Sequence, residues 1–341
     1  SPVLWIIPLL SALFALTLAG GIVYLLAKND IIDVDGQSQG ILSILVIGAA
    51  TDYALLLIAR YREELHLHQS RFAAMRAAYK GVWEPILASG STVAISLLIL
   101  LFSQLSNTAG LGPIGAIGIV CAMFTILTLL PAFLLIFGRW IFWPRRPLFD
   151  GDDHVMTGMW SKVGSTVGRN PRKAWVISGS VLLLFAFAST TLKTDGLGTI
   201  DTFTGNPESV VGQKKLETHF PGGEGDPTQV VFSAAKIEQM AAALKNAPGV
   251  TDVTPQLSAL PIPGQPLPDV AEVNGKVILN LTLNKAPDSV EAGNDIPKIR
   301  QIAHAKDPSS LVGGTSAVYF DVRTANNEDN RTIIPIILIV I

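Results

Sequence analysis

Five apolar stretches, each long enough to cross a membrane as a helix, lie within the first 192 residues of this 341-residue chain. About 20 apolar residues in a helix cover about 30 Å, which is the thickness of the hydrocarbon core of a bilayer. The pattern therefore predicts a membrane all-α helical bundle. The predicted spans are residues 3–27, 40–61, 86–105, 109–137 and 174–191. A last apolar run, 332–341, covers only about 15 Å and is expected to be the truncated start of a sixth span.

The polar connectors between the spans differ in charge, which predicts an orientation. Residues 62–82 and 138–173 are rich in Lys and Arg, whereas 28–39 is acidic and 103–108 is uncharged. Because basic connectors remain in the cytoplasm, we expect the region after residue 192 to lie on the extracytoplasmic side. Within 62–82, Phe72, Met75 and Tyr79 share one helical face and predict a helix lying on the membrane surface.

Residues 193–331 are polar and rich in Pro, Gly and Asp, and this composition predicts a folded domain outside the membrane. The strand and helix patterns follow the order βαββαβ, which is the ferredoxin-like α+β arrangement. A final helix, about 316–331, would return the chain to the membrane. The expected strands are 227–233, 249–256, 272–283 and 309–315, the expected helices are 235–246 and 288–305, and a Pro-rich loop fills 255–269.

One acidic residue interrupts the second span near its middle. Asp52 is followed by Tyr53 and preceded by the small residues 48–50. A charge at that depth costs about 2.5–3.5 kcal/mol or more, so intramembrane acids usually face a partner or a water path. Small residues let another helix approach closely. A structural Asp satisfied by neighbouring hydroxyls is the alternative, and a proton-binding site is the interpretation that we prefer.

Composition and motifs argue against several other classes of protein. The mean hydropathy of +0.43 is high, the net charge is only −2, and no basic block suggests nucleic acid. Cys121 is the sole cysteine, so neither a disulfide framework nor a thiolate metal site is expected. No GxxxxGK[ST] loop suggests ATP as the energy source, and no GxSxG elbow suggests a hydrolase. We predict no cofactor and no enzyme activity.

Two local patterns have plainer interpretations than a ligand site. Residues 110–115 match the dinucleotide glycine pattern, but they follow no strand and begin an apolar span, so small-residue helix packing is expected. His66 and His68 in the polar connector are expected to be solvated rather than metal ligands.

Three segments resemble one transporter family. They are GAATDYALLLIARYREE at 48–64, ASGSTVAISLLILLFSQLSNTAGLGPIGAIGI at 88–119, and GGTSAVYFDV at 313–322. The chain resembles the MMPL branch of the resistance-nodulation-division (RND) superfamily, which comprises bacterial lipid and drug exporters. The resemblance covers the chain from the family's third membrane helix to the start of its eighth. It implies that the first two helices, the first outer domain and the second half are missing from this fragment.

The resemblance also implies a mechanism. In the family, an Asp-Tyr pair on the fourth helix faces an equivalent pair on the tenth, and together they relay protons that drive export. Asp52 and Tyr53 match the first pair, the second pair is not in this sequence, and Ser89 matches a position lining the relay.

On this basis the expected function is proton-motive-force-driven antiport that exports lipids or amphiphilic drugs across the bacterial inner membrane. Residues 193–331 would form the porter domain, and a homo-oligomer is possible. The alternative is a non-transporting relative that senses lipid or helps to assemble a secretion system.

Overall fold

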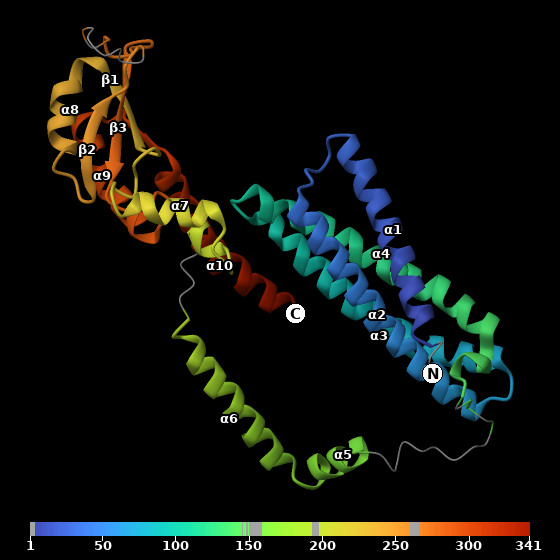
Figure 1. Cartoon of the computed structure of the whole chain (residues 1–341). Coiled ribbons are helices and arrows are strands. Elements are labelled where there is room, and N and C mark those ends of the chain that lie inside the picture. The colour runs from blue at the N-terminus through green and yellow to red at the C-terminus, as the bar shows by residue number, and fades with distance from the viewer. Residues whose placement is uncertain are drawn as a thin grey trace. The chain divides into compact units, whose positions relative to one another are not determined.

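The computed structural model describes residues 4–144, 146–147, 149, 159–192, 198–259, 266 and 268–341. The chain is mostly helical and divides into two compact units (Figure 1). The membrane unit comprises residues 1–184 and 328–341, and the sheet unit comprises residues 185–327. Parts of the predicted basic connector (145, 148, 150–158), residues 193–197 and part of the Pro-rich loop (260–265, 267) lie outside the described residues.

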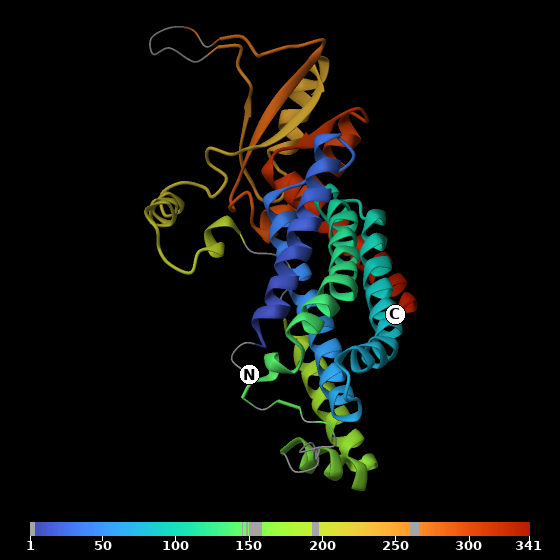
Figure 2. The ribbon, with the colours of Figure 1, turned by 90° about the vertical axis from the view of Figure 1, so that its right-hand side faces the viewer.

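Five described helices are long and apolar enough to cross a membrane, at the places that the hydrophobic pattern predicts. Four of them form a bundle in which α4 packs against the other three, and both views show this arrangement (Figures 1 and 2). The fifth, α6, follows the short α5. The bounds are α1 (Ile6–Lys28), α2 (Gly36–Leu67), α3 (Arg71–Leu98), α4 (Ser106–Phe137), α5 (Met159–Arg169) and α6 (Pro171–Ser189), with 3₁₀ turns η1 (Ile99–Phe102) and η2 (Gly138–Phe142).

Glycines let α4 approach its neighbours closely. A Cβ on Gly112 would lie 2.7 Å from the backbone oxygen of Leu97, and one on Gly118 would lie 2.7 Å from side-chain carbons of Leu42 and Val46. A glycine of α3 makes room for α4 in the same way, since a Cβ on Gly90 would collide with the side chain of Met123 on α4. The predicted small-residue packing of the 110–118 segment is therefore confirmed.

The polar stretch after the second span does not form a separate surface helix. It is divided between the end of α2 and the beginning of α3, which runs unbroken through Pro85. The reason is that small and apolar residues at 74, 75, 78 and 82 continue the buried face of residues 86, 90 and 94. Of the three residues in the prediction, Met75 is buried while Phe72 and Tyr79 are exposed.

The sheet unit contains a four-stranded antiparallel sheet in the order β2-β3-β1-β4. Alternate side chains of β1 and β3, including Phe232 and Leu281, are buried against α8 and α9. The bounds are β1 (Thr228–Ser233), α8 (Ile237–Leu244), β2 (Val250–Pro255), β3 (Lys276–Leu283), α9 (Val290–Lys306) and β4 (Leu311–Gly313).

The helices and strands of this unit differ from the predictions in three places. Strand β3 begins at Lys276, because Asn274 and Gly275 both have positive φ and form a turn between Val273 and Lys276. Helix α7 (Glu208–Glu217) was not predicted. The expected final helix and the apolar run after it form one continuous helix, α10 (Thr315–Val340).

Asp307 joins the end of α9 to the end of β1. Its buried carboxylate accepts hydrogen bonds from the backbone N–H of Ser233 (3.0 Å) and from the N–H and hydroxyl of Ser309 (3.2 and 3.0 Å). Lys236 Nζ lies 3.4 Å away. The backbone hydrogen bond from Ser233 is the main cause that lowers the pKa of Asp307 below its ordinary value.

We expect Gly112→Ala to destabilise the membrane unit by about 1–3 kcal/mol. The added methyl group would lie against the backbone oxygen of Leu97, which cannot move aside as a flexible side chain can. SDS titration of the purified protein in mixed micelles measures this change. Gly21→Ala is the matched control, since a Cβ there meets nothing within 4 Å. Equal stability of the two variants would contradict the proposed close approach.

We expect Asp307→Asn to loosen the sheet unit at pH 7, with a difference from the wild type that shrinks as the pH falls. The folded pKa lies below the unfolded pKa, so the carboxylate stabilises the fold above about pH 4 and this contribution is lost as acid protonates it. Hydrogen exchange of β1, corrected for intrinsic rates, measures the effect. Exposed Asp252→Asn is the control, and a pH-independent difference would refute the charge-based account.

Candidate functional site

Asp52 and Tyr53 lie near the middle of the 32-residue helix α2, and their side chains point in different directions. Tyr53 is 9% exposed and belongs to the core of the bundle, whereas Asp52 is exposed. Consecutive residues of a helix are rotated by about 100°, so one side chain can face the bundle while the next faces away from it. None of the ion pairs among the described residues involves Asp52.

Asp52 lies in the centre of an uncovered face of α2. This α2 face consists of residues one turn apart, namely Ile44, Gly48, Asp52, Leu55 and Ala59. Ile44 is 77% exposed and Leu55 is 60% exposed, and nothing lies within 4 Å of a Cβ placed on Gly48. The small residue leaves room for another helix beside the carboxylate.

Ser89 lies on α3, where it is exposed and lines a groove of about 470 Å³. Two further hydroxyl residues on the same helix, Thr92 and Ser96, line the groove. Thr92 donates to the carbonyl of Ala88 at 2.9 Å, while the buried Oγ of Ser96 has no hydrogen-bond partner. In the part of the chain that the structure describes, no hydrogen bond joins Ser89 to Asp52 or Tyr53.

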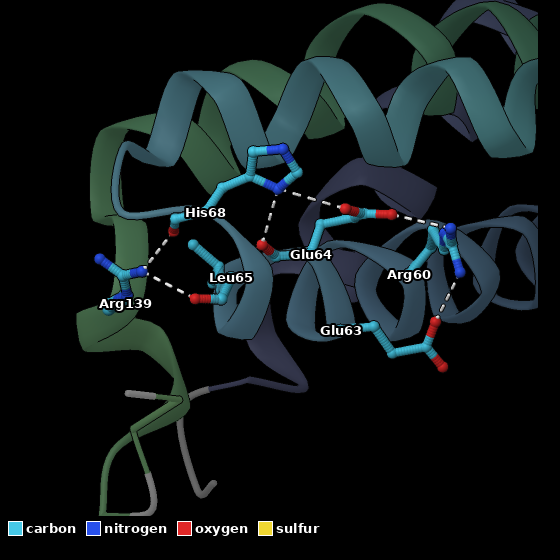
Figure 3. A network of polar contacts seen from close by, with 6 residues as sticks. All are labelled: Arg60, Glu63, Glu64, Leu65, His68 and Arg139. Carbon is cyan, nitrogen blue, oxygen red and sulfur yellow. Dashed lines mark hydrogen bonds and ion pairs between the residues drawn. The ribbon is translucent and has the colours of Figure 1, made fainter. Parts of the chain in front are cut away.

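The polar end of α2 carries a buried carboxylate, that of Glu64 (Figure 3). At 1.5 Å rise per residue it lies about 18 Å from Asp52 along the helix axis. Glu64 is 4% exposed and lies between two basic groups. Arg60 Nη2 lies 2.7 Å from one of its oxygens, and His68 Nδ1 lies 3.3 Å from the other. A buried charge needs such partners, because a lone one is strongly destabilising.

Arg139, in η2, holds the C-terminal end of α2. Its guanidinium donates to the carbonyl oxygens of Leu65 (2.7 Å), His68 (2.8 Å) and Gln69 (2.9 Å), as Figure 3 shows for the first two. Carbonyl oxygens at the C-terminal end of a helix lack donors within the helix and carry partial negative charge, so they attract a cation. From the sequence, Arg139 was expected to be a charge of the basic connector and part of an interfacial anchor with Trp140 and Trp143. His68 is engaged with Glu64, and no group of three or more potential metal ligands occurs among the described residues.

A third polar contact lies within the membrane unit, between the loop after η1 and α10. Asp329 is 7% exposed and accepts hydrogen bonds from Ser103 Oγ (2.6 Å) and from the backbone N–H of Gln104 (3.1 Å). Gln104 Nε2 also donates to Glu328 at 2.9 Å. The sequence carried a signal for this contact, because the acidic pair Glu328 and Asp329 lies just before the apolar run 332–341. This signal was missed.

Comparison with known proteins identifies the family. The model of the MMPL family matches residues 1–174, which is half of the chain. The chain belongs to the MMPL family. It is 43% identical, over its whole length, to the putative membrane protein ActII-3 of Streptomyces coelicolor, of which it covers 46%.

Two relatives carry names that state what they export. The apo-petrobactin exporter of Bacillus anthracis is 28% identical over 100% of this chain, which covers 48% of that protein. The sulfolipid-1 exporter MmpL8 of Mycobacterium tuberculosis is 27% identical over 98% of this chain, which covers 30% of it. The chain thus spans half or less of the length of these relatives. Its helices and its relatives identify it as part of a multi-pass membrane protein of a transporter family.

We expect Arg139→Gln to destabilise the membrane unit by about 1–3 kcal/mol, because three carbonyls lose a charged donor. Hydrogen exchange should accelerate in residues 65–70, where those carbonyls lie. Exposed Arg62→Gln is the control and should change stability by less than about 0.5 kcal/mol. Unchanged exchange at the end of α2 would show that Arg139 does not hold this helix end.

Proposed function

We propose that this MMPL chain is the part of a proton-driven exporter that carries one of its proton-binding carboxylates, Asp52. The observation on which the proposal rests is that this carboxylate lies at mid-helix on an uncovered face of α2. A carboxylate facing lipid would cost about 2.5–3.5 kcal/mol or more, so this face needs a protein partner or a water path. The chain spans about half of the length of two Streptomyces coelicolor relatives that it matches, so we propose the rest of a full-length protein of this kind as the partner.

A carboxylate in this position can link proton binding to helix packing. When Asp52 is charged, the α2 face favours a polar or hydrated partner, and when it is protonated the face can close against an apolar one. Tyr53, packed in the bundle core, would transmit the change to neighbouring helices, and Ser89 would line the proton path from α3. Export of lipids or amphiphiles is supported by the relatives named as petrobactin and sulfolipid-1 exporters.

The sheet unit would be a porter domain on the extracytoplasmic side of the bacterial plasma membrane. The element order βαββαβ and the sheet order β2-β3-β1-β4 support a ferredoxin-like fold for it. Its orientation follows from the basic connectors, which favour the cytoplasm. A lipid sensor with the same fold is the second candidate, and it would not need a titrating Asp52.

We expect Asp52→Asn to abolish export, because an amide cannot bind and release a proton at physiological pH. Efflux of a lipid substrate from proteoliposomes holding the full-length protein, under an imposed pH gradient, measures this. Asp52→Glu should retain part of the activity, since it restores a carboxylate. Exposed Asp33→Asn is the control and should export normally.

The stability of each variant in SDS titration separates loss of coupling from loss of the fold. Normal export by a folded Asp52→Asn variant would make Asp52 structural and would favour the sensor. Wild-type export that proceeds equally with and without the gradient would argue against proton drive.

A further inference from the structure

A pocket of about 390 Å³ opens on the sheet unit beside α7. We call it the α7 pocket. One wall is apolar and is formed by Ile200, Phe203 and the buried Val210. Three acidic residues, Glu224, Asp226 and Asp288, also line the pocket. A volume of this order suits one drug-sized molecule.

Two glycines allow the acidic turn that lines the pocket to lie close to the end of β3. A Cβ on Gly222 would lie 2.6 Å from the backbone nitrogen of Ala286, and one on Gly223 would lie 2.8 Å from the backbone of Leu283. Gly223 N–H donates to the Leu283 carbonyl at 3.0 Å, and Gly225 has a φ of +86°, which glycine adopts readily. The 221–226 turn is therefore held flush against the end of β3, so that its two carboxylates line the same pocket as Asp288.

The chemistry of the pocket selects a positively charged, partly apolar ligand. No lysine or arginine is found among the described residues that line it, and the exposed Glu224 and Asp226 give this lining a negative charge. Phe203 is 52% exposed, and an aromatic face open to the pocket can bind a cation as well as an alkyl chain. An anionic ligand would meet like charges on one side of the pocket.

We propose that the α7 pocket binds organic cations with an apolar body, that is, cationic amphiphiles. This inference deepens the proposed function, since it names a class of molecule for the exporter, and it rests on that function only for the direction of transport. Recognition depends on two contacts, carboxylates for the charged head and the Ile200–Phe203–Val210 wall for the apolar body.

Direct binding to the full chain in nanodiscs of neutral lipid tests the proposal without any pH gradient. A reporter dye is attached to Gln213→Cys at the pocket, and the native Cys121 is buried and should not compete for the dye. The same dye on Gln239→Cys of α8, outside the pocket, gives the background from partition into lipid. Decyltrimethylammonium is the cationic probe, decyl sulfate is the anionic probe, and lysophosphatidylethanolamine represents a membrane lipid with an amine.

We expect saturable binding of decyltrimethylammonium at the Gln213 reporter alone. Glu224→Gln/Asp226→Asn should weaken it about threefold to tenfold, because each exposed charge contributes modestly. The matched control Glu238→Gln/Asp252→Asn removes the same charge from exposed positions elsewhere on the unit and should leave the affinity unchanged. Phe203→Ala should weaken binding without altering the preference for the cation.

Three results would overturn the proposal. They are equal binding of decyl sulfate, tighter binding of the lysolipid than of the simple cation, and unchanged affinity in the Glu224→Gln/Asp226→Asn variant. Because this measurement uses no gradient, its failure is distinguishable from failure of proton-driven export, which Asp52→Asn tests separately.

Discussion

Close approach of α4 to its three neighbouring helices holds the membrane unit together, and that approach depends on the absence of side chains. In lipid, apolar helices gain little from the hydrophobic effect, so van der Waals contact at short range has to replace it. Gly112 lets the backbone of α4 approach the backbone of α3, and Gly118 lets it approach side chains of α2. Gly90 of α3 likewise makes room for the side chain of Met123 on α4. The positions of α2 and α3, and hence of Asp52 and Ser89, follow from this packing.

Three carboxylates of the membrane unit differ in their surroundings. Glu64 and Asp329 are buried and are satisfied by partners within the unit, namely Arg60 and His68 for the former and Ser103 and Gln104 for the latter. Asp52 forms none of the described ion pairs and faces outward from mid-helix. The difference separates carboxylates that fix the fold from the one that we propose binds a proton.

The sheet unit depends on polar connections at the ends of its elements. Asp307 binds the end of α9 to β1, and Arg300 of α9 forms a two-point ion pair with Asp321 of α10, at 2.6 and 2.7 Å. The hydrogen bonds from Arg300 lower the pKa of Asp321 below its ordinary value. Glycine acts here as well, since Gly222 and Gly223 bring the acidic turn against β3 and so form one side of the α7 pocket.

The sequence by itself determined the elements whose signal is local. Runs of about 20 apolar residues predicted the membrane helices, and alternating apolar and polar residues predicted the strands. Asp52 stood out because it is a carboxylate inside one of the apolar runs. The ends of elements were less certain: the Asn274–Gly275 turn was placed inside a strand, and α7 was missed because its apolar pattern is weak.

Only the tertiary structure decided which residues meet. Ser103 and Asp329 are 226 positions apart, and Arg139 reaches carbonyls 70 to 74 positions away. The α7 pocket likewise combines five separate segments, none of which carries a pattern of its own. Helix and strand periodicity report only whether a side chain is buried, whereas partners distant in sequence are chosen by the packing of the whole chain.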